Sequence, residues 1–201
     1  MDYQILFKTE MNIPSTCVLA GHSPDVMPWN CSSSSGAVKM KNTLIPLLEK
    51  LVTQKGVTHF MCGMSRGAAL LEASCVLQMK KKYPQISLQC VVPDKEFTSL
   101  WSASDKAAFR RIISKADSVM AMTDVPVRYG RRTRREYMVD CSGYLVCIYV
   151  PGSPGPCADM IEYAAEMGRG VIMIDPSSYR IYCYRSSAGS YAGPNRLDKA
   201  K

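Results

Sequence analysis

Residues 58–82, THFMCGMSRGAALLEASCVLQMKKK, contain the pattern that decides the fold. A short apolar run over 58–62 leads into a glycine-containing loop over 62–67, and an amphipathic segment over 66–82 follows. Apolar runs of this length beside glycine are typical of buried strands, whereas the longer periodic segment is typical of a helix. The stretch therefore predicts a strand, a tight loop and a helix in that order.

The same unit recurs along the chain and predicts an α/β fold. Because parallel strands need crossover connections and are buried on both faces, continuous apolar runs between helices indicate a Rossmann-like three-layer fold with a mainly parallel sheet. Edge strands are expected near both termini, at 5–7 and 179–184. We expect one domain over 1–185 and a loose tail over 186–201. Further strands are expected at 16–20, 86–92, 118–122, 144–150 and 171–174, and further helices at 38–54, 105–115, 133–141 and 158–167.

Length and composition are those of a globular protein outside the membrane. The chain has 201 residues, of which 47% are hydrophobic and 21% charged. Its longest apolar run, 144–150, is far shorter than the roughly 18 to 20 residues that cross a bilayer, and residues 1–4 lack the basic start of a secretion signal. Nine cysteines lie mostly in apolar runs and form no Cys-x-x-Cys pair. We therefore expect a cytoplasmic protein with reduced thiols, no metal site, no cofactor and no membrane partner.

Positive charge is concentrated in one segment. The formal net charge is +8, and residues 128–135 hold five arginines. Clustered guanidinium groups give forked hydrogen bonds to phosphate, which favours one anion-facing patch over a surface that coats nucleic acid. The alternative for each of these arginines is a place on a solvated helix face.

Four loops are candidates for a binding site, because ligands in such a sheet bind beyond the carboxyl ends of the strands. They span 20–24, 62–67, 128–135 and 151–159. Glycine lets the main chain approach a phosphate and helix N-termini carry partial positive charge, although the prolines of the last loop lack N–H donors. None of the loops has the P-loop or the Gly-x-Gly-x-x-Gly pattern, which argues against ATP hydrolysis and ordinary dinucleotide binding. The alternative is that the glycines only serve strand-to-helix turns.

Five short motifs in a fixed order give the chain a resemblance to a known family. They are Ala20-Gly21-His22-x-Pro24, Gly63-Met64-x-x-Gly67, Trp101 with Asp105, Tyr137-Met138-Val139-Asp140 and Pro151-Gly152-x-x-Gly155. Over residues 17–176 this order resembles the YpsA-like branch of the SLOG superfamily, which also includes the DprA DNA-processing proteins and the LOG phosphoribohydrolases. The resemblance implies a Rossmann-like fold that binds a nucleotide or a nucleotide-derived small molecule at the ends of its strands.

The expected ligand site combines glycine main chain with a few polar side chains. Arg134 occupies the position of the arginine in the family's Arg-Asn before the Tyr-Met-Val-Asp stretch, so the resemblance implies that it matters more than Arg131 or Arg132. The residues expected to contact the ligand are Gly21, His22, Gly63, Ser65, Arg66, Gly67, Arg134, Gly152, Ser153 and Gly155.

Departures from the family pattern bear on catalysis. Ala69 stands where an acidic residue is usual, and Pro156 and Cys157 replace Gly-Thr before the last helix. Against the LOG pattern Pro-Gly-Gly-x-Gly-Thr-x-Glu-Glu, the two acidic positions are Ala158 and Asp159, so one carboxylate is missing. Because cleavage of a glycosidic bond needs a placed acid or base, these departures predict binding or sensing of the ligand without efficient catalysis.

Two other functions are kept as alternatives. One is a nucleotide N-glycosidic hydrolase in which Asp159 or Glu162 is the acid-base carboxylate. The other is a single-strand DNA binder of the DprA kind, with the arginines of 128–135 on phosphates and Tyr129 stacked on a base. The small net charge outside that segment makes an extended nucleic-acid track the weaker alternative. Self-association into a homo-oligomer is left open by the sequence.

Overall fold

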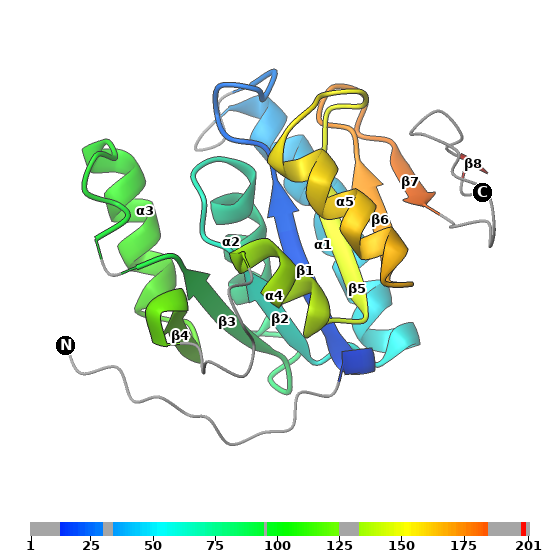
Figure 1. Cartoon of the computed structure of the whole chain (residues 1–201), viewed down its shortest axis with the longest axis horizontal. Helices are drawn as coiled ribbons and strands as arrows, with labels where there is room; N and C mark the ends of the chain where they lie inside the picture. The colour runs from blue at the N-terminus through cyan, green and yellow to red at the C-terminus, as the bar shows by residue number, and fades with distance from the viewer. Residues whose placement is uncertain (1–12, 30–33, 95, 125–132, 185–197, 200–201) are drawn as a thin grey trace.

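The computed structural model describes residues 13–29, 34–94, 96–124, 133–184 and 198–199. They form an α/β fold around one sheet with the strand order β4-β3-β2-β1-β5-β6-β7-β8 (Figure 1). Strands β1 to β6 pair in parallel, and β7 and β8 continue the sheet with antiparallel pairs. The predicted Rossmann-like fold with a mainly parallel sheet is confirmed. The strands are β1 (Thr16–Gly21), β2 (His59–Cys62), β3 (Ser87–Val92), β4 (Ser118–Ala121), β5 (Tyr144–Ile148), β6 (Gly170–Ile174), β7 (Ile181–Tyr184) and β8 (Asp198–Lys199).

Helices cover both faces of the sheet and complete the three layers. Figure 1 shows α4 and α5 in front of the sheet and α1 and α2 behind it, and α3 packs beside α2. Within the described part of the chain, none of the helices is both long and apolar enough to cross a bilayer. The helices are α1 (Ser35–Lys55), α2 (Ala68–Met79), α3 (Ala103–Ile113), α4 (Arg134–Asp140) and α5 (Pro156–Glu166), with short 3₁₀ turns η1 (Ile13–Ser15) and η2 (Met122–Asp124).

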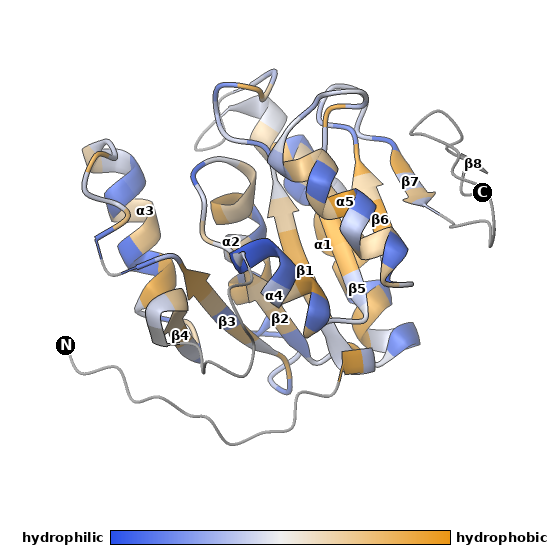
Figure 2. Ribbon diagram, in the orientation of Figure 1, coloured by the Kyte–Doolittle hydropathy of each residue, from blue (hydrophilic) through white to orange (hydrophobic). Residues whose placement is uncertain are grey.

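Alternate residues of the central strands supply two apolar cores, one on each face of the sheet. Cys17 and Leu19 of β1 belong to the core under α1 and α2, whereas Val18 belongs to the core under α4 and α5. In β5, Val146 lies in the first core and Cys147 in the second. Figure 2 shows the strands as a hydrophobic interior between helices of mixed character. Burial on both faces is the reason why these strands read as continuous apolar runs in the sequence.

The order of the strands reverses beside β1. The chain places β2, β3 and β4 on one side of β1, and then β5 and β6 on its other side. In open α/β sheets, ligands bind at the carboxyl ends of the strands where the order reverses in this way. The topology therefore places the expected ligand site at the loops that follow β1 and β5.

Several element boundaries differ by a few residues from those expected, and two of the differences lie at the ends of loops that were candidates for the site. The strand expected over 144–150 ends at Ile148, because the chain then turns and the Ser153 N–H donates to the Val150 carbonyl oxygen at 3.1 Å. The helix expected over 66–82 begins after Gly67, whose φ of 88° and ψ of −124° are not helical.

The edge strand expected over 179–184 is confirmed as β7, which pairs antiparallel with β6. The other expected edge strand, 5–7, lies outside the described residues. β8 falls within 186–201, the segment expected to be a tail, and pairs with β7.

Candidate functional site

Backbone hydrogen bonds join the loop after β1 to two neighbouring elements at the carboxyl edge of the sheet. The His22 N–H donates to the Ile148 carbonyl oxygen at 3.2 Å, and the Ala68 N–H donates to the His22 carbonyl oxygen at 3.1 Å. The first bond fastens the loop to the end of β5, and the second fastens it to the start of α2. The three glycine-containing loops after β1, β2 and β5 therefore lie at one edge, as expected (Figure 1).

Trp29 holds the far part of the same loop. Its Nε1 donates to the Pro176 carbonyl oxygen, which lies between β6 and β7, at 2.7 Å. The indole also lies against the first turn of α1, where a Cβ on Gly36 would be 2.3 Å from Trp29 Cγ. The loop after β1 is thus attached to the sheet at both of its described ends.

Gly21 and Gly67 allow β1 and α2 to approach each other closely. A Cβ on Gly21 would lie 2.5 Å from the Ala68 Cβ, and a Cβ on Gly67 would lie 2.7 Å from the His22 carbonyl oxygen. Both neighbours are close to the main chain and have little room to move in a well-packed interior. Packing of β1 against α2 accounts for glycine at these two positions without a ligand.

Helices α2 and α5 both begin at this edge of the sheet without a side-chain cap. Gly67 precedes α2 and Gly155 precedes α5, and neither helix start has a side-chain cap hydrogen bond. By contrast, Ser34, Ser102 and Thr133 cap α1, α3 and α4. Backbone amides in an uncapped first turn are available to water or to an anion. Because α2 and α5 cover opposite faces, their first turns lie on either side of the sheet edge.

The loop after β5 is a tight turn that leads directly into α5. Pro151 and Gly152 occupy its centre, Gly152 has a φ of 79°, and the Ser153 N–H donates to the Val150 carbonyl oxygen. Proline followed by a residue of positive φ is the pattern of a type II turn. The Tyr149 hydroxyl donates to the Ser153 carbonyl oxygen at 2.7 Å. The main-chain polar groups of Ser153 are therefore used within the loop itself.

His22 is buried at the centre of this edge. It is 6% exposed, and its ring stacks on the ring of Tyr149 with a centroid distance of 5.3 Å and an interplanar angle of 21°. Within the described residues, its Nε2 atom has no hydrogen-bond partner. Buried polar atoms without a partner are rare and costly. His22 Nε2 is therefore a polar group at this edge that a ligand could satisfy.

Cys157, in the first turn of α5, contacts a second thiol and His22. Interaction with the Cys147 thiol lowers the pKa of Cys157, although burial opposes this, and His22 and the charge of Arg135 lower it further. The same interaction, together with burial, raises the pKa of Cys147 well above its ordinary value. Cys157 is half-buried and Cys147 is buried. Of the two thiols, Cys157 therefore loses its proton more readily than Cys147.

Arg134 reaches from the start of α4 into the ends of β2 and β3. Its Nη1 donates to the carbonyl oxygens of Gly63 at 2.5 Å and Val91 at 3.4 Å, and its Nη2 donates to the Ser65 Oγ at 3.2 Å. Burial lowers the pKa of Arg134. These bonds use much of the guanidinium to hold α4 in place. Three of the five clustered arginines, Arg128, Arg131 and Arg132, lie outside the described residues.

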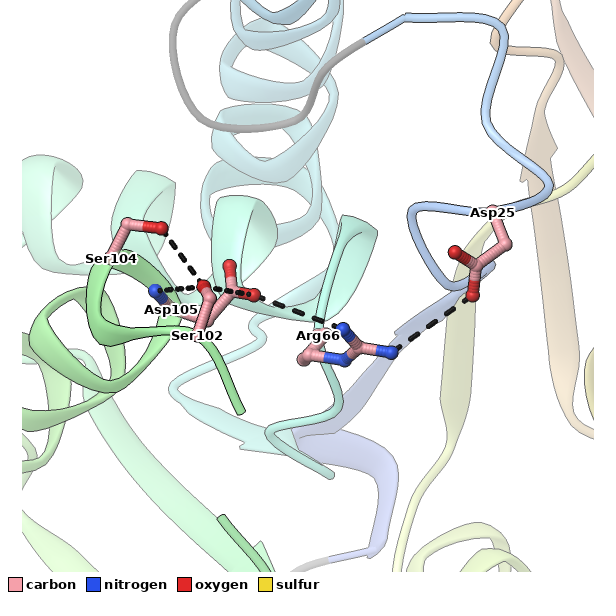
Figure 3. A network of polar contacts seen from close by, with 5 residues as sticks. All are labelled: Asp25, Arg66, Ser102, Ser104 and Asp105. Atoms are coloured by element: carbon pink, nitrogen blue, oxygen red, sulfur yellow. Dashed lines mark hydrogen bonds and ion pairs between the residues drawn. The ribbon is translucent and has the colours of Figure 1, made fainter. Parts of the chain in front are cut away.

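Arg66 lies between two carboxylates at the rim of the edge (Figure 3). Its Nη2 is 4.0 Å from Asp25 Oδ2 and its Nη1 is 4.0 Å from Asp105 Oδ2. Asp105 also accepts a hydrogen bond from the Ser102 Oγ at 2.9 Å. Asp25 is well exposed, and Arg66 and Asp105 are partly exposed, so these long ion pairs are weak and Arg66 can turn toward an anion at small cost.

The two carboxylates considered for hydrolysis lie on the exposed side of α5. Asp159 is in the first turn, and Glu162 follows one turn later. Burial is the main cause of the raised pKa of Tyr149, and the charge of Glu162 adds to it. Both carboxylates therefore belong to the same edge as the glycine loops. Among the described residues, no group of His, Cys, Asp and Glu side chains is arranged to hold a metal ion.

The sequence pattern of the YspA SLOG family (YpsA) matches residues 17–171. The chain belongs to this SLOG family. The uncharacterized SPbeta prophage-derived protein YoqJ of Bacillus subtilis is 28% identical over 141 residues, which cover 64% of this chain and 82% of the relative. A UPF0398 protein of Bacillus cereus is 24% identical over 128 residues, which cover 61% of this chain and 68% of that relative. A UPF0398 protein of Staphylococcus epidermidis is 26% identical over 102 residues, which cover 50% of this chain and 54% of that relative.

The Tyr137-Met138-Val139-Asp140 motif of the SLOG resemblance packs in the core and lies apart from the loops of the candidate site. Tyr137, Met138 and Val139 are buried in the core under α4 and α5. Asp140 accepts a hydrogen bond from the Tyr163 hydroxyl at 2.8 Å, which links α4 to α5. The motif therefore fixes the packing of two helices on one face of the sheet.

Sequence reasoning missed two chemical groups of this SLOG chain. Glu72 of α2 is completely buried, neither of its carboxylate oxygens has a hydrogen-bond partner within the described residues, and burial raises its pKa well above the ordinary value. A single acid within the apolar segment 68–79 is a signal that could have been noticed. Cys157 was considered only as a replacement for threonine. Its position at a helix N-terminus was visible in the sequence, but its contact with Cys147 was not.

Proposed function

We propose that the protein binds a small nucleotide-derived ligand at the carboxyl edge of its sheet, with a phosphate at the first turn of α5. Membership of the SLOG family supports a ligand of the nucleotide type. The observation that carries the proposal is the buried His22, whose Nε2 has no hydrogen-bond partner within the described residues and whose side chain acts on the thiol of that first turn. A nucleotide offers hydroxyl and base donors or acceptors that can satisfy such a nitrogen.

The first turn of α5 supplies the donors for a phosphate. Pro156 has no N–H, so the amides of Cys157 and Ala158 are the donors, and Gly155 leaves the approach open because a Cβ there would meet nothing within 4 Å. A helix N-terminus favours an anion through these amides and through its dipole. The positive charge of Arg135, which already acts on Cys157, adds to the attraction.

The residues expected at the site divide into two roles under this proposal. One set contacts the ligand through glycine main chain and through polar side chains at the edge: Gly152, Gly155, His22, Ser153 and Arg66. The remaining residues hold the loops in position through the bonds and close approaches described above: Gly21, Gly63, Ser65, Gly67 and Arg134.

Because the pKa of Cys157 is lowered, ionisation of its thiol opposes a second anion at the same helix end, and this has a measurable consequence. An arriving phosphate raises the pKa of the Cys157 thiol, so binding takes up a proton at any pH where this thiol is ionised in the free protein. Affinity relative to a Cys157→Thr variant should therefore fall as pH rises from about 5 to 8. Threonine at this position keeps a donor group without the charge.

Calorimetric titration with nucleoside monophosphates, ADP-ribose, inorganic phosphate and a short single-stranded oligonucleotide tests the proposal. We expect a nucleotide or ADP-ribose to bind, and Ala158→Glu to weaken binding on the order of 10-fold or more by placing a carboxylate beside the amides. The matched control is Gln54→Glu, which adds the same charge at the exposed end of α1 on the opposite edge. Equal loss in both variants, or binding of the oligonucleotide alone, would contradict the proposal.

A further inference from the structure

We propose that Tyr149 is a positioning residue of the ligand site, which holds His22 of the loop after β1 and Ser153 of the loop after β5 in one fixed arrangement. This role rests on the proposed function, since it concerns the same edge of the sheet. It follows from two contacts of one side chain: the ring of Tyr149 stacks on His22, and its hydroxyl donates to the Ser153 carbonyl oxygen. A single residue therefore joins two loops that are expected to contact the ligand.

Tyr149 is itself fixed by the sheet. It directly follows Ile148, the last residue of β5, and its N–H donates to the carbonyl oxygen of Ile174, the last residue of β6, at 3.0 Å. Its side chain is 6% exposed and belongs to the core under α4 and α5. Side chains that packing locks on rigid elements hold a binding site more precisely than side chains on loops. Both contacts of Tyr149 therefore originate from the end of a central strand.

The stacking contact fixes the direction in which His22 presents its ring nitrogens. The His22 N–H donates to the Ile148 carbonyl oxygen at 3.2 Å and holds the backbone, while the ring lies nearly parallel to that of Tyr149, at an interplanar angle of 21°. Stacked aromatic pairs stabilise each other beyond the area that they bury. Because Tyr149 covers one face of the ring, this arrangement favours a hydrogen bond of Nε2 in the ring plane, with a ligand hydroxyl or base edge.

The hydroxyl contact fixes the loop that leads into α5. The Tyr149 hydroxyl donates to the Ser153 carbonyl oxygen at 2.7 Å, and the Ser153 N–H donates to the Val150 carbonyl oxygen at 3.1 Å. These two bonds close the turn shortly before Gly155, after which the uncapped first turn of α5 begins. A loop that is ordered before binding does not have to be ordered by the ligand, so it binds more tightly. Removal of the hydroxyl should therefore weaken binding without removing a group that contacts the ligand.

Two variants separate the contacts, and a third is the matched control. Tyr149→Phe keeps the ring but removes the bond to Ser153, whereas Tyr149→Leu removes both the bond and the stacking on His22. Tyr163→Phe removes a comparable hydroxyl bond, 2.8 Å long to Asp140, which links α5 to α4. Calorimetric titration with ADP-ribose measures the effect on binding. We expect affinity to fall about 3- to 10-fold in Tyr149→Phe and about 10- to 100-fold in Tyr149→Leu, and to change less than about 2-fold in Tyr163→Phe.

The ring signals of His22 in nuclear magnetic resonance spectra test the same role without a ligand. The chain has two histidines, and the signals of His59, which is exposed at the start of β2, are identified by their loss in His59→Gln. We expect the ring of residue 149 to shift the His22 ring protons upfield in the wild type and in Tyr149→Phe, and this shift to disappear in Tyr149→Leu. Amide hydrogen exchange over 152–155 should be about 3- to 10-fold faster in Tyr149→Phe than in the wild type or in Tyr163→Phe.

The two kinds of measurement distinguish failure of this role from failure of the proposed function. Equal loss of ADP-ribose affinity in Tyr149→Phe and Tyr163→Phe would overturn the positioning role, as would an unchanged His22 ring shift in Tyr149→Leu. If ADP-ribose does not bind the wild type, the proposed function fails for this probe, whereas the ring shift and the exchange rates still decide on the role of Tyr149. Because Tyr149→Phe keeps the packed ring, its exchange rates and affinity provide the test even where Tyr149→Leu does not fold.

Discussion

The guanidinium of Arg134 donates a hydrogen bond to the carbonyl oxygen of Gly63, which precedes it by 71 residues in the chain. This bond and the one to Ser65 fasten the start of α4 to the loop after β2. Lysine keeps the charge but cannot make both bonds from one planar group. We expect Arg134→Lys to lower the free energy of unfolding by about 1–3 kcal/mol. Urea denaturation measures this loss, and Arg135→Lys is the matched control. Equal stability of the two variants would show that the bonds contribute little.

The cost of burying Glu72 should depend on pH in a defined direction. The folded-state pKa of Glu72 is raised above that of the unfolded chain, so the folded protein holds a proton that the unfolded chain releases at neutral pH. The contribution of this group to stability is therefore largest at acid pH and is lost as pH rises toward the raised pKa. We expect Glu72→Gln to melt at a higher temperature than the wild type at about pH 8, with a gap that shrinks toward about pH 5. Thermal melts across this range measure the gap, and a gap that is constant with pH would contradict the prediction.

A methyl group on Gly67 should cost more than one on Gly168. Both glycines have positive φ, 88° and 69°, but a Cβ on Gly67 would lie 2.7 Å from the His22 carbonyl oxygen, whereas a Cβ on Gly168 would meet nothing within 4 Å. We expect about 2–4 kcal/mol of destabilisation for Gly67→Ala, from backbone strain and from the contact together. Gly168→Ala carries only the strain and should lose about 1–2 kcal/mol. Chemical denaturation of both variants separates the two contributions.

Binding without rapid cleavage is the expected behaviour toward nucleotides. The LOG-like acidic pair is reduced to Asp159, and general acid-base catalysis supplies about 10²- to 10⁴-fold in rate when its groups are in place. Incubation with nucleoside monophosphates and ADP-ribose, followed by chromatography of free base and ribose phosphate, should show no repeated turnover. Turnover that disappears in Asp159→Asn or Glu162→Gln would establish the hydrolase alternative in its place.

Sequence patterns predicted the layers of the fold well, because strands and helices each follow from the local periodicity of apolar residues. The strand–loop–helix unit of residues 58–82 forms β2 and α2, and the apolar runs read as buried parallel strands. The place of the candidate site followed from topology, since every such sheet gathers its helix-preceding loops at one edge.

The roles of single residues were harder to predict, because they depend on contacts between segments distant in the chain. Arg134 was expected to face a ligand, but its contacts with Gly63 and Val91 arise only when β2, β3 and α4 assemble. The contact of Cys147 with Cys157 likewise depends on how β5 and α5 pack. Neither contact can be read from the spacing of residues in the sequence or from its composition.

The attachment of Trp29 to Pro176 gives the molecule its own optical reporter. The chain has two tryptophans, and Trp101 lies in an edge-to-face aromatic cluster with Phe97 and Phe109 near α3. In a Trp101→Phe background, indole emission would come from Trp29 alone. Its wavelength would then report whether the contact between Trp29 and Pro176 is kept when a ligand is added. Stopped-flow fluorescence could thus time events at the sheet edge without any attached dye.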